Sequence, residues 1–285
     1  GCGLIGSSIL KSSIKNKIFK NIYVYEKIKK NRKIIKKIHK NIKFIYKLNE
    51  DLIKMNFVVV CTPMSEYDLI FPKLDKFVSD KSVITEVGST KRNLLKFTKN
   101  KNIILSHPIA GSEVSGPAFG HEELFKNKWC ILINKGRKNK IELAKKFWKK
   151  IGSKVILMNA KEHDKIFAIT SHLPHLIAYN LIKTAQDFQR IEKKNLIKYS
   201  AGGLRDFSRT AASNQIMWRD IFFSNKDNMI ISINKFIHNL NLIKRSIRDK
   251  KDKDLKKILI DSKKVRKQIV NLKQDVSKPD FGREI

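Results

Sequence analysis

The sequence predicts an α/β protein in which a doubly wound parallel sheet is followed by an all-helical part. Short apolar runs alternate with helical stretches over about the first 160 residues, as in folds whose parallel strands are joined by helices. The run FVVVC at residues 57–61 is apolar throughout, which is expected of a strand buried on both faces. After Ala160 the strand-like runs stop and long amphipathic stretches replace them.

The predicted strands are short and rich in β-branched and aromatic residues. In chain order they are residues 21–25, 57–61, 82–86, 102–105, 129–133 and 155–158. The spacing of apolar residues predicts helices at 27–39 and 91–99 between them.

The second half of the sequence predicts helices only. Residues 162–189 form one long amphipathic stretch, which we expect Pro174 to kink. Further helices are predicted at 195–201, 214–224, 227–249 and 253–272. We therefore divide the chain into a sheet-containing domain at 1–160, a helical domain at 161–276 and a tail at 277–285.

A glycine-rich turn, Gly1-x-Gly3-x-x-Gly6, opens the sequence and leads into a predicted helix. In such a turn the first glycine permits a tight bend, the second lets the backbone approach a pyrophosphate, and the third packs helix against strand. Glu26 lies about 20 residues further on, where a carboxylate would bind the adenine ribose and disfavour a 2′-phosphate. This pattern predicts a Rossmann-like domain that binds NAD, although neighbouring lysines leave some tolerance for NADP. The expected cofactor contacts are Gly1, Gly3, Leu4, Ile5, Gly6, Glu26, Cys61, Thr62 and Pro63.

One strand of that fold is absent from the predicted set. A dinucleotide-binding sheet has its first strand at the centre, directly before the glycine turn. Because the sequence starts at Gly1, we expect the first strand to be missing.

The formal charge of +35 raises the alternative of a basic nucleic-acid-binding protein. The excess consists of 50 lysines against 11 arginines, spread over the whole chain beside abundant Ile and Asn. A/T-rich codons produce this composition, and a binding face would show one basic stripe interleaved with aromatics. We therefore interpret the charge as a solvated basic surface that can help attract an anionic substrate.

Composition also limits the compartment. No apolar run approaches the length that spans a bilayer, so we expect no membrane partner. Three widely spaced cysteines, Cys2, Cys61 and Cys130, fit neither a disulfide framework nor a zinc site. We expect a reducing, cytoplasmic environment.

Three segments carry polar residues that folding alone does not require. The first, SHPIAGSEVSG at 106–116, places His107 after a predicted strand, at the sheet edge where α/β proteins bind ligands. The second, SHLPHLIAY at 171–179, holds His172 and His175; without further ligands at metal-site spacing, they predict no metal. The third, SAGGLRDFSRTAAS at 200–213 with MWRDIF at 217–222, holds three arginines, a residue suited to carboxylates. Arg209 is our candidate; Arg205 and Arg219 fit a structural Arg–Asp network equally well.

These segments, together with the glycine turn and TEVGSTK at 85–91, resemble in order the signature blocks of the prephenate/arogenate (cyclohexadienyl) dehydrogenase family. The resemblance implies a nucleotide-binding domain, a helical domain that forms a homodimer, and an active site between the two. It further implies that His107 is catalytic, that Ser89 contacts the substrate hydroxyl, and that Arg209 binds a carboxylate. His175, Met217 and Trp218 would line the substrate pocket, and Asp206 would gate it or pair within it.

The implied reaction is an NAD-dependent oxidative decarboxylation of prephenate, and possibly of arogenate, on the route to tyrosine. His107 would accept the proton of the ring hydroxyl, because an imidazole has an ordinary pKa near working pH. Alternatives are another dehydrogenase or reductase of similar build, such as a β-hydroxyacid dehydrogenase or an imine reductase, and the basic nucleic-acid-binding protein. The first two need a catalytic Lys or a different pocket, which the segments around His107 and Arg209 disfavour.

Overall fold

The structure is a computed structural model that describes residues 1–38 and 40–274. The chain divides into two compact units, residues 1–229 and 230–285. The predicted tail at 277–285, and His39 at the end of a predicted helix, lie outside the described residues.

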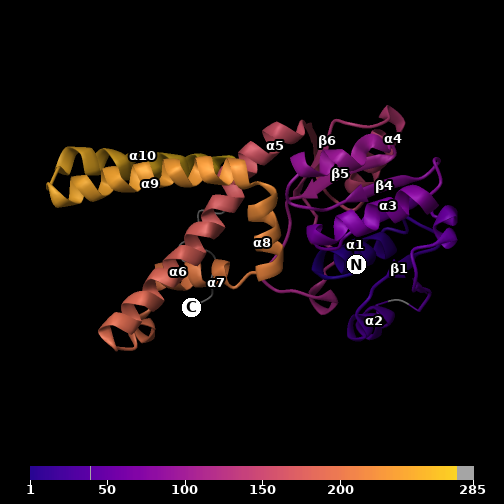
Figure 1. Ribbon diagram of the computed structural model, residues 1–285, viewed down its shortest axis with the longest axis horizontal. Coiled ribbons are helices and arrows are strands. Elements are labelled where there is room, and N and C mark those ends of the chain that lie inside the picture. Colours follow the sequence, from indigo (N-terminus) through magenta and orange to yellow (C-terminus); the bar gives the residue numbers. More distant parts are fainter. Residues whose placement is uncertain (39, 275–285) are drawn as a thin grey trace. The chain divides into compact units, whose positions relative to one another are not determined.

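A five-stranded sheet forms the centre of the first unit (Figure 1), in the order β3-β4-β5-β6-β7. Its strands are β3 (Phe57–Val60), β4 (Val83–Glu86), β5 (Ile103–Pro108), β6 (Trp129–Ile133) and β7 (Lys154–Met158). Strands β3, β4 and β5 are parallel, and β6 is parallel to β7. The doubly wound α/β class predicted from the sequence is therefore confirmed.

The pairing of β5 with β6 differs from a fully parallel sheet, because the two strands run antiparallel. A parallel connection needs a crossover of a dozen or more residues that usually contains a helix. The chain between β5 and β6 forms only a short 3₁₀ turn, η4 (Pro117–Phe119). As a consequence β5 extends to Pro108, three residues beyond its predicted end, and His107 pairs with Ile131 inside the strand.

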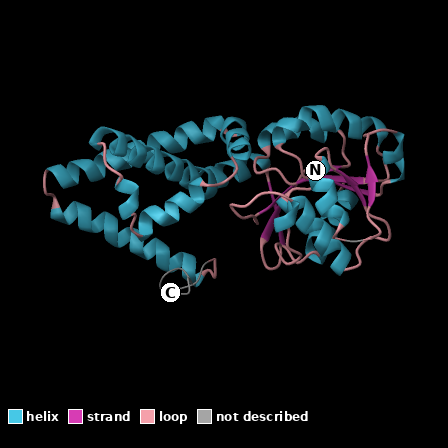
Figure 2. Cartoon of the chain, turned by 90° about the horizontal axis from the view of Figure 1, so that it is seen from below, coloured by secondary structure: helices cyan, strands magenta, loops and turns pink. Residues whose placement is uncertain are grey.

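Helices lie on both sides of the strands (Figure 2). They are α1 (Leu4–Lys15), α3 (Tyr67–Phe77) and α4 (Lys138–Lys150), with 3₁₀ segments η1 (Glu50–Lys54), η2 (Met64–Glu66) and η3 (Arg92–Lys99). Successive residues of β5 face opposite layers, as the two-residue period of a strand requires. Ile103 packs in the cluster that contains Phe71 of α3, and Ile104 packs in the one that contains Trp148 of α4.

A separate pair of parallel strands, β1 (Tyr23–Tyr25) and β2 (Lys43–Ile45), lies beside α2 (Lys29–Lys36). A cavity of about 580 Å³ runs between β1 and β3 and is lined by residues of both strands and of α1. In the dinucleotide-binding strand order one further strand occupies this position.

The helical part of the first unit consists of α5 (Ala160–Phe167), the π-helical turn η5 (Ala168–His172), α6 (Leu173–Glu192), η6 (Leu196–Tyr199), α7 (Gly202–Ala211) and α8 (Gln215–Ser224). The stretch predicted as one kinked helix is interrupted by η5, directly before Pro174, whose ring cannot continue the regular bonding pattern.

Hydrogen bonds tie these helices to the loops that follow β3 and β4. Asp164 accepts the backbone N–H of Lys91, and Asp220 accepts that of Ser65. The compact units therefore do not divide at residue 160, and the domain boundary there stays a prediction.

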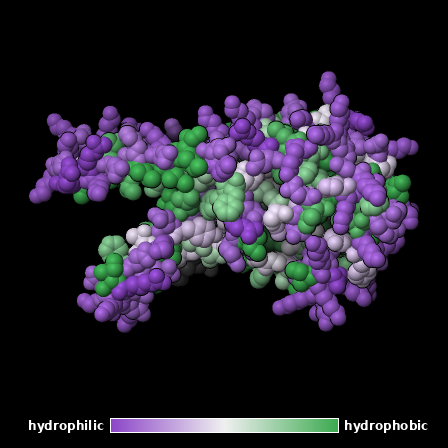
Figure 3. Space-filling view, viewed as in Figure 1, coloured by the Kyte–Doolittle hydropathy of each residue, from purple (hydrophilic) through white to green (hydrophobic). Residues whose placement is uncertain are grey.

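The second unit contains α9 (Lys226–Arg248) from Ile230 onward and α10 (Asp252–Asn271). A three-residue turn joins them, and α10 runs back along α9 (Figure 1). Apolar side chains collect along one side of this hairpin, and hydrophilic ones cover the rest of the visible face (Figure 3). Among the described helices, none combines the length and the apolar character needed to cross a bilayer.

Candidate active site

His107 lies in β5 with 8% of its surface exposed. Its ring Nδ1 is 2.8 Å from Nε2 of His163, and its ring packs edge-on against Phe167. Burial lowers the pKa of His107 well below its usual value, and repulsion from His163, Lys91 and His172 lowers it further. The imidazole is therefore neutral at physiological pH, which is the state that a general base requires.

Ser89 lies in the loop after β4, at the same sheet edge as His107, because β4 and β5 are parallel neighbours. The loop is held by Glu86, whose carboxylate accepts the backbone N–H of Gly88 at 2.6 Å. Lys91 donates to the same carboxylate and to the Ser106 carbonyl, and this ion pair is completely buried. Removal of either partner would leave an unpaired buried charge, at a cost of about 3–5 kcal/mol.

Arg209 projects from α7 and forms an ion pair with Glu113, with 3.7 Å between Nη1 and Oε2. Glu113 belongs to the loop that follows His107, so the pair brings two of the predicted segments together. Both side chains are substantially exposed, at 63% and 36%. Such a pair contributes only about 0–1 kcal/mol, so the guanidinium is available to exchange Glu113 for a substrate carboxylate. Asp206, one turn earlier on α7, is half-buried.

His175 and Trp218 lie side by side. The imidazole stacks on the indole with ring centroids 3.8 Å apart, and Trp218 is buried. His175 Nδ1 donates to the Ser171 carbonyl, which leaves Nε2 as an acceptor. Met217 precedes Trp218 in α8, so its side chain points about 100° away around the helix axis and is 42% exposed. The structure therefore does not group Met217 with the other two.

The other predicted polar residues of these helices have structural contacts. His172 is fully buried, and its Nδ1 lies 3.2 Å from the Asn225 side-chain nitrogen. Arg219 pairs with Asp220, whose other carboxylate oxygen accepts the Ser65 N–H, so the Arg–Asp network considered for this segment is present here.

The glycine turn meets the end of β3, which brings together the predicted cofactor contacts of these two segments. A Cβ on Gly6 would lie 2.7 Å from the Gly1 carbonyl oxygen, so only glycine fits there. A Cβ on Gly3 would meet nothing within 4 Å, so the space above the start of α1 is open. Leu4 and Ile5 begin α1, and their N–H groups belong to the first turn, which has no partners within the helix.

Two more of the predicted contacts border this turn. Cys61 and Thr62 lie within 3.4 Å of the positions that added Cβ atoms on Gly1 and Gly6 would occupy, and Pro63 follows them. The Thr62 hydroxyl is buried without a partner among the described residues, so a polar ligand can satisfy it. These features fit a pyrophosphate.

Glu26 is buried at the end of β1, where its carboxylate accepts the backbone N–H groups of Cys2 and Ile28. Each oxygen retains an acceptor lone pair for a ribose hydroxyl. Glu26 thus braces the glycine turn, in addition to the ribose contact predicted for it.

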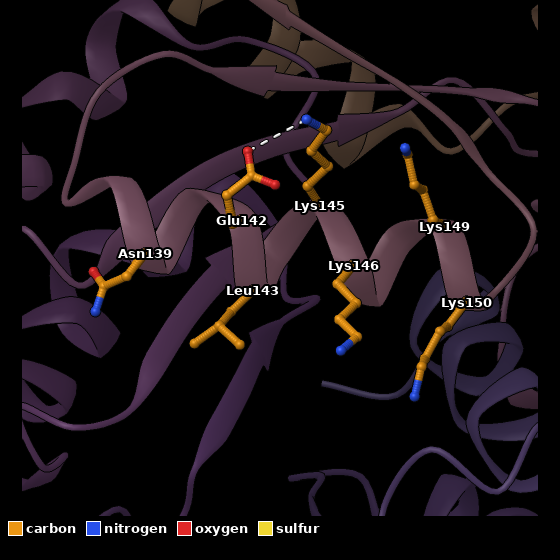
Figure 4. A pocket seen from close by; sticks show the side chains of 7 residues that line it. All are labelled: Asn139, Glu142, Leu143, Lys145, Lys146, Lys149 and Lys150. Carbon is orange, nitrogen blue, oxygen red and sulfur yellow. Dashed lines mark hydrogen bonds and ion pairs between the residues drawn. The ribbon is translucent and has the colours of Figure 1, made fainter.

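A hollow of about 810 Å³ lies along the exposed face of α4 (Figure 4). All of its lining residues belong to that one helix: Asn139, Glu142, Leu143, Lys145, Lys146, Lys149 and Lys150. No group from a second element converges on it, so we assign the site to the sheet edge instead.

Sequence reasoning missed the groups behind the site, which are Glu86, Lys91, His163 and Asp164. A carboxylate and an ammonium five residues apart at the end of an apolar strand were an available signal for the first two. The adjacent His163 and Asp164 gave no such signal, because their role depends on contacts that the fold alone creates.

Comparison with known proteins covers most of the chain. Residues 11–157 match the prephenate dehydrogenase nucleotide-binding domain, and residues 159–261 match the prephenate dehydrogenase dimerization domain. A cyclohexadienyl dehydrogenase from Zymomonas mobilis is 28% identical over 253 residues, which are 87% of this chain and 86% of that protein.

Solved structures agree with these matches. A prephenate dehydrogenase from Aquifex aeolicus, in complex with hydroxyphenyl propionate and NAD+, superimposes with a TM-score of 0.88 at 31% identity. The match covers 94% of this chain and 96% of that one. A Synechocystis arogenate dehydrogenase, at 20% identity and a TM-score of 0.76 over 94% and 97% of the chains, shares the fold.

Proposed function

This chain belongs to the prephenate dehydrogenase family, and from that premise we propose that it catalyses the NAD-dependent oxidative decarboxylation of prephenate. The proposal depends above all on His107, a buried neutral imidazole at the edge of the sheet where the parallel strands β3, β4 and β5 end and where the end of β3 meets the glycine turn. Open α/β sheets bind their ligands at this edge.

Bound NAD supplies a hydride acceptor for the ring carbon that carries the substrate hydroxyl. His107 Nε2 accepts the hydroxyl proton as the hydride departs, and we assign Ser89 to contact the same hydroxyl. The bond between the ring carbon and its carboxylate then breaks, and CO₂ leaves. The electron pair of that bond makes the ring aromatic, and the proton returns from His107 to the ring oxygen. A positioned general base of this kind contributes about 10² to 10⁴-fold.

We assign Arg209 to a substrate carboxylate, and His175 with Trp218 to the substrate pocket. A guanidinium binds a carboxylate through two parallel hydrogen bonds and does not donate a proton, so the carboxylate stays ionised. The pocket assignment is supported by the stacked pair and by the acceptor nitrogen that His175 retains. Asp206 is assigned to the same helix surface as Arg209, and Met217 to the outer rim.

We assign the NAD pyrophosphate to the start of α1, beside Gly1, Gly3 and Gly6, and the adenine ribose to Glu26. The open space above Gly3 supports the first assignment, and the remaining lone pairs of the Glu26 carboxylate support the second. A buried carboxylate also repels a 2′-phosphate, so we expect NAD to be preferred over NADP.

We infer a homodimer that forms through the helical half of the chain, and a cytoplasmic location. The match to a dimerization domain supports the dimer, as do the large exposed apolar side chains of α9 and α10. The three cysteines are free thiols, which fits a reducing compartment.

Initial rates with prephenate and arogenate, each with NAD and NADP, test this function. We expect the highest kcat/KM with prephenate and NAD, and NADH formation in that reaction. Turnover with arogenate alone would change the substrate assignment. No reduction of either cofactor with either substrate would overturn the enzyme assignment.

A further inference from the structure

A continuous line of buried hydrogen bonds runs away from His107 into the protein. His107 Nδ1 lies 2.8 Å from His163 Nε2, and His163 Nδ1 lies 2.8 Å from Asp164 Oδ1. The His163 ring is completely buried and Asp164 is 1% exposed. Water therefore does not compete for these bonds, and each has a defined direction.

Asp164 is fixed as an acceptor at the far end of this line. Its Oδ1 accepts the Lys91 N–H and its Oδ2 accepts the Arg92 N–H, both at 2.8 Å. Its backbone carbonyl accepts the Asn225 side-chain amide, also at 2.8 Å. A carboxylate held by two N–H donors can only receive a further proton donor, so His163 Nδ1 must carry a hydrogen.

The position of that hydrogen determines which nitrogen of each imidazole along the line carries a proton. Burial lowers the pKa of His163, against the opposing hydrogen bond to Asp164, so the ring is neutral and its Nε2 is an acceptor. His107 is also neutral, so its Nδ1 donates to His163. Nε2 of His107 is left with a free lone pair and has no hydrogen-bond partner among the described residues.

We propose that His163 and Asp164 are positioning residues for His107, which hold its ring in place and select the tautomer whose Nε2 can accept the substrate hydroxyl proton. The inference rests on the proposed dehydrogenase function. When Nε2 takes that proton, the new positive charge faces a polarised imidazole backed by a carboxylate, so the line stabilises the charge without moving a proton itself. The charged or titratable groups that border it are Lys91, Glu86, Cys130 and His172.

Three substitutions at His163 separate this role from simple packing. In His163→Gln the side-chain amide reaches the place of Nε2 and can accept from His107, whereas in His163→Asn it reaches only the place of Nδ1 and can bond to Asp164. His163→Leu fills similar space with neither bond. Because Phe167 packs against the ring at 4.5 Å between centroids, a purely structural residue would tolerate Leu best.

We expect kcat to fall about 10- to 100-fold in His163→Leu and in His163→Asn, with KM for prephenate changed less than about threefold. His163→Gln should retain kcat within about fivefold of the parent. Equal kcat in all variants, or equal losses in Gln and Asn, would overturn the proposal. Thermal unfolding of each variant identifies any that lose activity because they are unfolded.

Imidazole nitrogen NMR shifts in the ligand-free protein provide a test that needs no turnover. We expect His107 to be protonated at Nδ1 in the parent and in His163→Gln, and to show mixed tautomers in His163→Leu; the His107→Asn variant identifies its signals. An unchanged tautomer in His163→Leu would refute the positioning role even if the enzyme is active. Absence of turnover in the parent, with the expected tautomers, would reject only the dehydrogenase function.

Discussion

Three buried histidines and the exposed Arg209 differ in charge state because they differ in exposure to water. His107, His163 and His172 are enclosed, so desolvation lowers the pKa of each and keeps them neutral. Arg209 remains at the surface with a weakly held partner, Glu113. A buried neutral imidazole is suited to accept a proton, and an exposed guanidinium is suited to bind a carboxylate.

Arg209→Gln should raise KM for prephenate about 10- to 100-fold and change kcat less than about threefold. The variant loses charge-assisted hydrogen bonds worth roughly 1.5–3 kcal/mol, and the 63% exposure of the guanidinium places the loss in this range. Steady-state kinetics measures both constants, and Arg190→Gln on α6 is the matched control. An unchanged KM would remove Arg209 from the substrate site.

Acid should destabilise the fold through the buried histidines. Burial lowers the pKa of His172 to about 4 from its ordinary 6.5, against the attraction of Asp164. The unfolded chain binds a proton near pH 6.5 that the folded chain does not bind until about pH 4. Stability is therefore complete above pH 6.5 and is lost as pH falls through this window.

Between pH 7 and pH 5, His172 alone should lower the free energy of unfolding by about 2 kcal/mol, and His107 and His163 act in the same direction. Urea unfolding at both pH values measures the difference. The His172→Asn variant should show a smaller one; an identical pH slope in that variant would contradict the assignment.

Among the elements, the glycine turn and β5 show how the chain positions its chemistry. The turn places the N–H groups at the start of α1 beside the end of β3. Strand β5 carries His107 near its end, where residues 106–108 pair with β6, and its residues 103–105 pair with β4. The His107 ring is thus carried by a strand of the sheet and not by a loop.

Gly3→Ala tests the cofactor cradle directly. An added Cβ meets no protein atom within 4 Å, so the free energy of unfolding should change by less than about 1 kcal/mol. If the pyrophosphate occupies that space, the Kd for NAD measured by calorimetry should rise at least about tenfold. Gly203→Ala, whose Cβ also meets nothing, is the control. An unchanged Kd would place the cofactor elsewhere.

Much of the fold follows from sequence periodicity, because continuous apolar runs and amphipathic stretches can be recognised without knowing the long-range contacts. Strand β6 was predicted at its observed residues, but its antiparallel direction was not. The direction depends on the short connection from β5, which has no crossover helix, and not on the composition of β6 itself. The segment at 91–99 forms a 3₁₀ helix, and the N–H groups of Lys91 and Arg92 at its start are bound by Asp164, a long-range contact that propensity cannot show.

The sequence indicated candidate site residues where a residue type is unusual for its position, as with His107 or with arginine in a lysine-rich chain. Contacts between residues far apart in the sequence were not predictable. His163 reaches His107 across 56 positions, and only the packing of α5 against β5 brings them together. Glu26 was expected to bind the ribose, and the sequence did not show that its carboxylate also accepts the backbone N–H groups of Cys2 and Ile28.

Charge and exposed apolar area are distributed differently over the surface of the molecule. The net charge of +35 is distributed over many elements, including the lysines of α4 (Figure 4), as expected of a solvated surface. The apolar side of the α9 and α10 hairpin (Figure 3) is localised and is the better candidate for a protein interface. Charge of this sign also attracts an anionic substrate.

The dimer should depend on this apolar side. Ile237 and Leu240 of α9 are 49% and 51% exposed, and one turn of the helix separates them. We expect Ile237→Asp with Leu240→Asp to weaken self-association at least about 100-fold, because burial of two such side chains contributes roughly 3 kcal/mol or more. Sedimentation velocity should show the parent at twice the 33.1 kDa chain mass.

Asn239→Asp adds the same type of charge to an exposed polar position of α9 and should leave the dimer intact. A parent that sediments as a monomer would exclude the dimer. A dimer that persists in the double variant would place the interface on other helices.

The most direct measurement of the proposed chemistry is the amount of NADH and CO₂ released in one sample of enzyme, prephenate and NAD. We expect one NADH for each CO₂, and we expect His107→Asn to slow the release of both by at least about 100-fold. The assignment would be contradicted if authentic prephenate yields no NADH, or if the His107→Asn variant releases both products as fast as the parent.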